Sequence, residues 1–191
     1  MNRRKAIGHI LLAGAGGGII AAGYKWHDWH KAPDMAFVEA NKSLIAALAE
    51  TIIPATDTPG AIEAGVPDFI IVMLKDCTET KSKNKFINGL KELQAYSLSN
   101  YDKPYENCTA EQQYSILKHF EERDKPWSGI MGKIQNRFLG RPFFATLKHY
   151  TVEGYGTSMI GSTKGFIWLP VPGRYLGCIP MQPGQRSWAT K

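Results

Sequence analysis

Three cysteines are the side chains best suited to chemistry in this chain of 191 residues. Cys178 stands alone in the stretch WLPVPGRYLGCIP, which holds too many prolines and glycines for a helix. In an oxidising compartment thiols tend to pair, and an odd count leaves one for an intermolecular bond or as a free thiol. Cys77 and Cys108 are a possible disulfide. The open alternatives are three reduced thiols, or a bond from Cys178 to one of the other two.

Other reactive side chains lack partners at a useful spacing. His27 and His30 lie three residues apart without a third ligand nearby, so they indicate a solvated linker rather than a metal site. Glu121 and Glu122 are adjacent and therefore face different sides of a helix. Ser158 has small neighbours but no evident base. Motifs for covalent haem, phosphate loops, zinc hydrolases and nucleophile elbows are missing, so we expect no catalytic, cofactor-binding or metal-binding residues in this chain.

The first 23 residues, MNRRKAIGHILLAGAGGGIIAAG, have the plan of an export signal: a basic start, an uncharged run and a small-residue end. The pair Arg3 and Arg4 favours the twin-arginine pathway, which moves cargo that is already folded. The uncharged run between Lys5 and Lys25 is 19 residues long. At ~1.5 Å per residue it nearly spans a ~30 Å hydrocarbon core, so an uncleaved membrane anchor is the alternative.

The net charge of +6 is partly local, because this first segment holds three basic residues and no acidic one. In the remainder, 20 basic residues face 17 acidic ones, which leaves +3. The basic group Lys81, Lys83 and Lys85 is expected in a solvated polar loop. A hydrophobic content of 43% and a charged content of 21% are typical of a globular protein. We therefore expect one globular domain and no nucleic-acid binding.

Apolar residues recur at helical spacing through the body of the chain, and no segment alternates as a strand would. The expected fold is an all-α domain of about five helices over residues 34–167, between a linker at 24–33 and an irregular Pro/Gly-rich arm at 168–191 (the C-terminal arm). The expected helices are 34–53 behind an Asp34 cap, 67–77 with Pro67 in its first turn, 84–101 with Leu98 facing inward, 110–124 behind a Thr109–Gln112 capping box, and 127–156 with a break near Gly140 and Pro142.

Three strings carry a resemblance to a known family: LAETIIPATDTPGAIEAGVPDFI, FFATLKHYTVEGYGTSMIG and PVPGRYLGCIP. Together they resemble gluconate 2-dehydrogenase subunit 3, the small or gamma subunit of membrane-associated flavin sugar dehydrogenases, over roughly residues 40 to 180. The resemblance implies a small helical protein that holds no redox cofactor. It also implies a large partner subunit of the glucose-methanol-choline type, which binds FAD and oxidises a sugar or alcohol.

In such complexes a multihaem cytochrome c subunit often passes electrons to the membrane quinone pool, which implies haem c in a further partner. The small subunit typically carries the twin-arginine signal for the pair. The resemblance therefore implies recognition by the twin-arginine translocase and a periplasmic location, associated with the inner membrane through the complex or through an uncleaved signal anchor.

The C-terminal arm is expected to dock the large subunit. Its prolines shape an extended, low-entropy segment, and Trp168, Pro172, Arg174 and Tyr175 are of types suited to an interface. Cys178 is a candidate for a disulfide to the large subunit. The alternative is that the arm packs on its own domain. A second class of function also stays open, in which the chain is a free-standing enzyme or binding protein of the cell envelope.

Overall fold

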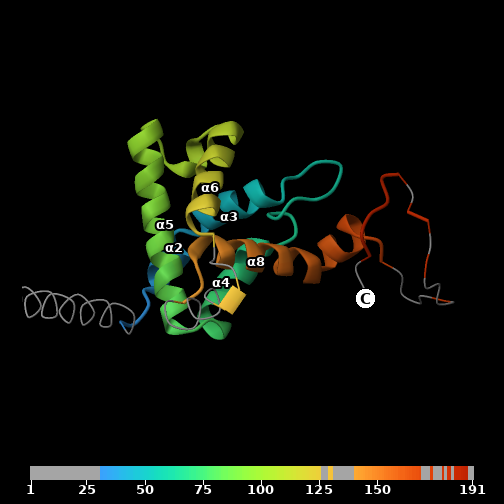
Figure 1. Ribbon diagram of the computed structural model, residues 1–191, viewed down its shortest axis with the longest axis horizontal. Helices are drawn as coiled ribbons and strands as arrows, with labels where there is room; N and C mark the ends of the chain where they lie inside the picture. Colours follow the sequence, from blue (N-terminus) through green and yellow to red (C-terminus); the bar gives the residue numbers. More distant parts are fainter. Residues whose placement is uncertain are drawn as a thin grey trace, which may run out of the picture.

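The computed structural model describes residues 31–125, 129–130, 140–168, 173, 178, 180–181 and 183–188, and within them the fold is all-α, as predicted (Figure 1). The α-helices are α2 (Met35–Ala40), α3 (Lys42–Ile52), α4 (Val66–Val72), α5 (Thr80–Tyr101), α6 (Ala110–Arg123) and α8 (Phe143–Thr157). A π-helix, η1 (Met73–Cys77), extends α4, and a second π-helix, η3 (Gly161–Gly165), follows α8. Between α5 and α6, η2 (Tyr105–Asn107) is a 3-10 turn. No helix among the described residues is both long and apolar enough to cross a membrane.

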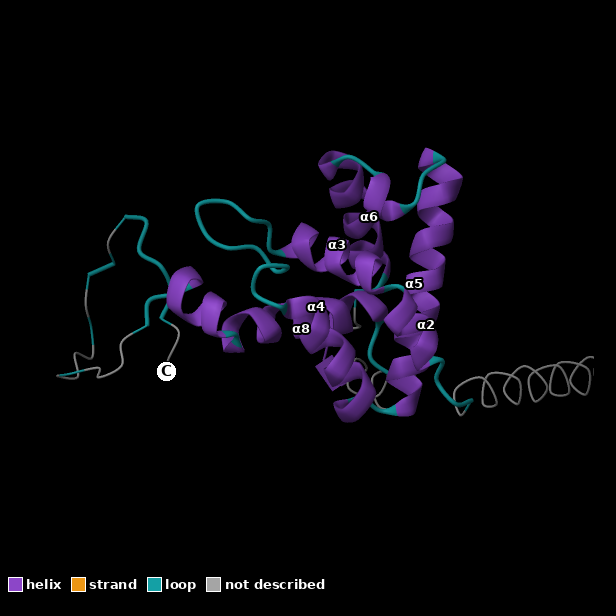
Figure 2. Cartoon of the chain, turned by 180° about the vertical axis from the view of Figure 1, so that it is seen from behind, coloured by secondary structure: helices purple, strands orange, loops and turns teal. Residues whose placement is uncertain are grey.

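The described ends of the chain lie on opposite sides of the helical body (Figures 1 and 2). The chain enters beside α5, where the Asn84 side-chain amide donates to the Lys31 carbonyl at 2.8 Å. On the far side, α8 leads into the described residues of the C-terminal arm, and the loop of residues 54–65 (the connector) projects beside them. The fold therefore separates the arm and connector from the point where the N-terminal segment joins.

The first expected helix is two helices, because the chain bends at Asn41. Asp34 caps the first as predicted, since its carboxylate accepts from the Phe37 amide at 3.0 Å. The Asn41 side-chain amide donates to the Phe37 carbonyl at 2.8 Å, and its oxygen accepts from Gln94 at 3.0 Å. An asparagine whose side chain bonds to the backbone competes with the helix, and here it ends α2.

α5 begins earlier than expected, at Thr80, so Lys81, Lys83 and Lys85 lie on a helix and the expectation of a polar loop is wrong. The Lys83 ammonium donates to the Lys75 carbonyl at 2.6 Å, at the end of η1. Lys85 donates to the Gly140 carbonyl at 3.3 Å. Burial lowers the pKa of Lys85, and the neighbouring Asp124 partly opposes that shift. The lysines therefore tie α5 to its neighbours.

Local signals set the starts of the last long helices as predicted. Thr109 and Gln112 form the capping box of α6, with both reciprocal bonds present. α8 starts directly after Pro142, and Gly140 has a φ of 76°, which glycine adopts without steric cost. Asp124 joins the two helices, because its carboxylate accepts from the Phe144 amide at 3.1 Å. The end of α6 therefore caps the start of α8.

The core lies where α3, α5, α6 and α8 meet. Leu44, Ile45 and Leu48 of α3 are fully buried, and each apolar side chain of this size contributes about 1.5–3 kcal/mol when buried. The Phe143 ring, from the first residue of α8, lies 5.2 Å from Phe86 of α5 and 6.0 Å from Phe120 of α6, between ring centres. This aromatic group fixes the start of α8 against two other helices.

Leu98 is half-exposed, so its predicted inward position is wrong. Ser97 takes the buried position, where its hydroxyl donates to the Lys103 carbonyl at 2.7 Å and lies 3.3 Å from the Cys108 sulfur. The hydroxyl provides a hydrogen-bond donor for a backbone carbonyl in the turn that follows α5. The hydrophobic pattern of the sequence did not reveal this buried polar position.

Gly89 of α5 faces Phe143, and a Cβ atom there would lie 2.3 Å from the ring. Alanine at an open helix position is worth about 1 kcal/mol over glycine, but here it must displace the ring. We expect Gly89→Ala to lower the free energy of unfolding by about 1–3 kcal/mol in urea titrations of the purified chain. The exposed neighbour Asn88→Ala is the control and should leave stability within about 0.5 kcal/mol. A stabilised Gly89→Ala variant would contradict this packing.

Candidate partner-docking site

The Glu50 side chain accepts hydrogen bonds from two separate parts of the connector. One oxygen of its carboxylate accepts from the Ala55 amide and the other from the Ile62 amide, both at 2.9 Å. Gly60 lies against the same carboxylate, where a Cβ atom would come within 2.1 Å of an oxygen. The Ala61 amide also donates to the Ile53 carbonyl at 3.0 Å. One side chain of α3 thus satisfies both sides of a loop that has no regular structure.

Sequence analysis missed Glu50, although a signal was present. An acidic residue in the last turn of a helix faces the negative end of the helix dipole, which disfavours it. Such a residue four positions before the turn-rich stretch PATDTPGA needs a compensating partner, and amides in and directly after that stretch provide it.

Tyr155, near the end of α8, joins the connector to the residues directly before the arm. Its side chain is buried, and its hydroxyl donates to the Pro59 carbonyl at 2.8 Å. Its ring meets the Phe166 ring edge-on, with centroids 6.0 Å apart. Gly165 packs on the ring so closely that a Cβ atom would lie 2.5 Å from the hydroxyl oxygen. Two of the three sequence strings that resemble the family are therefore in contact through the Tyr155 side chain.

Ser158 has a structural role at this turn. Its hydroxyl donates to the Tyr155 carbonyl at 2.8 Å and accepts from the Gly161 amide at 2.9 Å. The hydroxyl is thus committed to the bend between α8 and η3.

The described parts of the arm return to the body. The Ile167 amide donates to the Ser187 carbonyl at 2.8 Å, and Ile167 and Trp188 form an isolated bridge. Arg186 donates to the Lys164 carbonyl at 2.7 Å and pairs with Asp57 of the connector at 3.8 Å. Residues 164–167, directly before the arm, and residues 186–188, near its end, are therefore held together beside the connector.

Connector and arm enclose a shallow hollow of about 490 Å³. It is lined by Ala55–Pro59 and by Glu63, Lys164 and Arg186. Lys164 and Glu63 pair across it at 3.7 Å, so both basic groups of the rim have an acidic neighbour. Such exposed pairs contribute about 0–1 kcal/mol each, and they orient the two segments more than they stabilise them.

Large apolar side chains stay exposed at this end of the molecule. We define the docking end as the connector, residues 155–165 and the described residues of the arm. Its exposed apolar side chains are Ile62, Met159, Trp168, Met181 and Trp188, and Val152 lies close by on α8. Met159 is 79% exposed and Trp168 is 48% exposed. Aromatic and methionine side chains are enriched in the cores of protein interfaces, so the docking end has the composition of an interaction surface.

The predicted partner-binding residues are only partly described. Trp168 and Cys178 are exposed, and Trp168 belongs to the docking end. Pro172, Arg174 and Tyr175 lie outside the described residues, as do Arg3 and Arg4 of the predicted signal.

The possible disulfide between Cys77 and Cys108 is not formed, because all three cysteines are free thiols in the structure. Cys108 is buried and its sulfur lies 3.3 Å from the Ser97 hydroxyl, whereas Cys77 is exposed at the end of η1. The Cys108 thiol therefore contacts polar groups of α5 and of the turn that follows it, the Ser97 hydroxyl and the Pro104 carbonyl.

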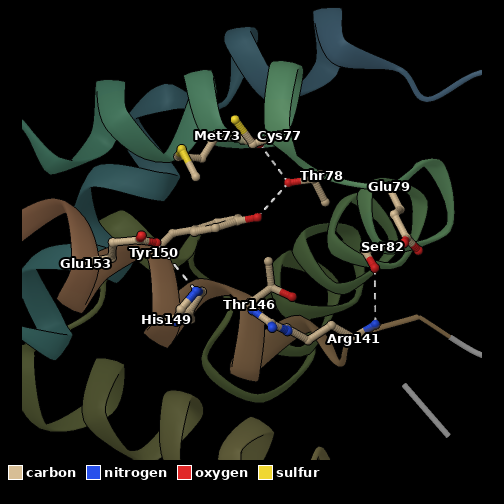
Figure 3. A pocket seen from close by; sticks show the side chains of 10 residues that line it. All are labelled: Met73, Cys77, Thr78, Glu79, Ser82, Arg141, Thr146, His149, Tyr150 and Glu153. Atoms are coloured by element: carbon tan, nitrogen blue, oxygen red, sulfur yellow. Dashed lines mark hydrogen bonds and ion pairs between the residues drawn. The ribbon is translucent and has the colours of Figure 1, made fainter. Parts of the chain in front are cut away.

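A second hollow, a cleft of about 850 Å³, lies between η1, the start of α5 and α8 (Figure 3). The Tyr150 hydroxyl lies 2.8 Å from the Thr78 hydroxyl, and His149 pairs with Glu153 at 3.5 Å. In Figure 3 the Tyr150 ring lies between Cys77 and His149, so this thiol and imidazole do not form a nucleophile–base pair. No group of three or more His, Cys, Asp or Glu side chains among the described residues is arranged to hold a metal ion.

The hold of Glu50 on the connector is testable by removal of its carboxylate. Glu50→Ala leaves two loop amides without their charged acceptor, which we expect to cost about 1–3 kcal/mol. Limited proteolysis should then cleave within residues 55–62 much faster than in the unmodified chain. Glu122→Ala, which removes an exposed carboxylate from α6, is the control and should leave the cleavage rate unchanged. Equal resistance in the two variants would contradict the assignment.

A family model described as gluconate 2-dehydrogenase subunit 3 matches residues 39–173. The matched range holds the connector, α8 with Tyr155, and the first residues of the arm. Comparisons with curated proteins and with solved structures gave no match. The family match covers well over half of the sequence, and the chain belongs to the gluconate 2-dehydrogenase subunit 3 family.

Proposed function

We propose that this chain is the non-catalytic small subunit of a periplasmic dehydrogenase complex, whose large subunit is an FAD-dependent enzyme of the glucose-methanol-choline type. The small subunit binds the large subunit through the docking end, stabilises it and carries it through the twin-arginine translocase. The observation that carries the proposal is the family match over residues 39–173, which includes most of the docking end.

The chemistry of the docking end supports binding of a protein. Exposed tryptophan and methionine side chains gain the most when a partner removes them from water. The basic groups at its rim already pair within the chain, through Lys164 with Glu63 and Arg186 with Asp57. A partner that covers this surface therefore meets apolar area and balanced charge.

The N-terminal segment supports the export role. Arg3 and Arg4 suit a pathway that transports folded cargo, and an FAD enzyme must fold around its cofactor before it crosses the membrane. On this proposal the cofactors are FAD in the large subunit and haem c in a cytochrome subunit, and the assembled complex is held at the inner membrane.

A second candidate function, a free-standing enzyme or binding protein, is favoured by one observation. The cleft between η1, α5 and α8 has a polar lining that includes Arg141, His149 and Glu153, and its volume of about 850 Å³ suits a small molecule. The capture experiment below separates the two functions.

Export is tested by Arg3→Lys combined with Arg4→Lys, which keeps the charge but removes the arginine pair. With the large subunit co-expressed, we expect both proteins to stay in the cytoplasm, because the large subunit crosses only as a passenger. Cell fractionation followed by immunoblotting measures the distribution. Lys5→Arg is the control and should export normally. Periplasmic large subunit in the double variant would count against the passenger role.

Docking is tested by capture of the large subunit on the purified small subunit. We expect Trp168→Ala to weaken the complex by about 30-fold, because loss of a tryptophan at the centre of an interface costs about 2 kcal/mol. Tyr114→Ala, which removes an exposed aromatic side chain from α6, is the control and should bind as the unmodified chain does.

The same samples distinguish the remaining possibilities. If electrophoresis without reductant shows the two subunits in one band that Cys178→Ser abolishes, Cys178 forms the expected bond to the partner. A flavin spectrum with substrate-dependent dye reduction in the isolated small subunit would instead support the free-standing enzyme.

A further inference from the structure

Tyr155, on the last turns of α8, contacts both the connector and the residues directly before the arm. Its hydroxyl donates to Pro59 at 2.8 Å, and its ring packs against Gly165 and Phe166. The connector tip that it holds is otherwise exposed, from Pro54 to Asp57. The bond therefore fixes the position of a surface loop.

Other contacts between connector and arm are weaker and lie at the surface. The Arg186–Asp57 and Lys164–Glu63 pairs measure 3.8 and 3.7 Å, and all four side chains are largely exposed to water. Salt and competing water weaken such pairs. The Tyr155 hydroxyl is sheltered from water, so it gives the junction its most specific constraint.

The glycines around Tyr155 show how closely the junction is packed. A Cβ atom at Gly165 would lie 2.5 Å from the hydroxyl, and one at Gly161 would lie 1.9 Å from the Tyr155 carbonyl oxygen. The backbone of η3 thus lies directly against the Tyr155 phenol at Gly165 and against the Tyr155 backbone at Gly161. Because the same phenol bonds to Pro59, the position of the connector is coupled to that of η3.

We propose that Tyr155 is a positioning residue for assembly of the complex: its hydroxyl joins the connector and η3 into one preformed surface, and the dehydrogenase large subunit contacts both. The connector thereby becomes a second part of the interface, in addition to the arm. A surface that is ordered before binding loses less conformational entropy when the partner docks. This inference rests on the proposed function and adds to it the residue that sets the geometry of binding.

The test is Tyr155→Phe, which removes the hydroxyl and keeps the ring. We expect the affinity for the large subunit to fall about three- to tenfold, the loss expected for one net hydrogen bond that preorganises the surface. Hydrogen exchange at the Ile62 and Ile167 amides should become faster, because both amides lie next to the released junction.

Tyr105→Phe is the matched control. Tyr105 is also a buried tyrosine, and its hydroxyl donates to the Thr51 hydroxyl of α3 at 2.9 Å, within the helical body. Its loss should lower the unfolding temperature and leave the affinity for the large subunit unchanged. If the role of Tyr155 were purely structural, Tyr155→Phe would also lower the unfolding temperature and leave the affinity for the large subunit unchanged.

The outcomes separate the inference from the proposed function. If the unmodified chain captures the large subunit and Tyr155→Phe captures it equally well, the positioning role is wrong and the proposed function stands. If the unmodified chain fails to capture the large subunit, the proposed function itself is wrong.

Discussion

The connector between α3 and α4 keeps its shape because one carboxylate occupies its centre. Backbone amides in an irregular loop need acceptors, and Glu50 supplies two of them from a helix that is itself fixed in the core. Tyr155 then secures the same loop from the opposite side, through the Pro59 carbonyl. These two side chains therefore hold the connector from two different helices, α3 and α8.

The placement of Tyr155 depends in turn on where α8 begins. Phe143 packs between Phe86 and Phe120, and the small size of Gly89 makes room for its ring. Asp124 caps the same helix from the end of α6. Farther along α8, a Cβ atom at Gly154 would lie 2.6 Å from the Phe69 ring, so α8 also packs closely on α4. The packing of α8 against the other helices thus fixes the position of the Tyr155 side chain.

Features with a local physical cause could be predicted from the sequence. The Asp34 cap, the Thr109–Gln112 capping box and the helix start after Pro142 each depend on a few neighbouring residues, and each is present. The all-α class follows from the spacing of apolar residues in the same way. The string resemblance also identified the family, because it rests on long stretches rather than on single residues.

Features that depend on distant residues could not be predicted. The bend at Asn41 involves Gln94, and the inward turn of Ser97 involves Cys108, so neither has a local signature. The choice among the possible states of Cys77 and Cys108 stayed open for the same reason, since sequence position does not tell which thiol a turn encloses. Sequence analysis did not predict that the connector lies beside Lys164 and Arg186, because these residues are distant in the sequence and meet only in the folded chain.

The bridge between Ile167 and Trp188 has a thermodynamic consequence. A segment whose two ends are tied together can change its length with little effect on stability, because closure entropy grows only with the logarithm of loop length. The stability of the helical body is therefore nearly independent of the number of residues between these two positions.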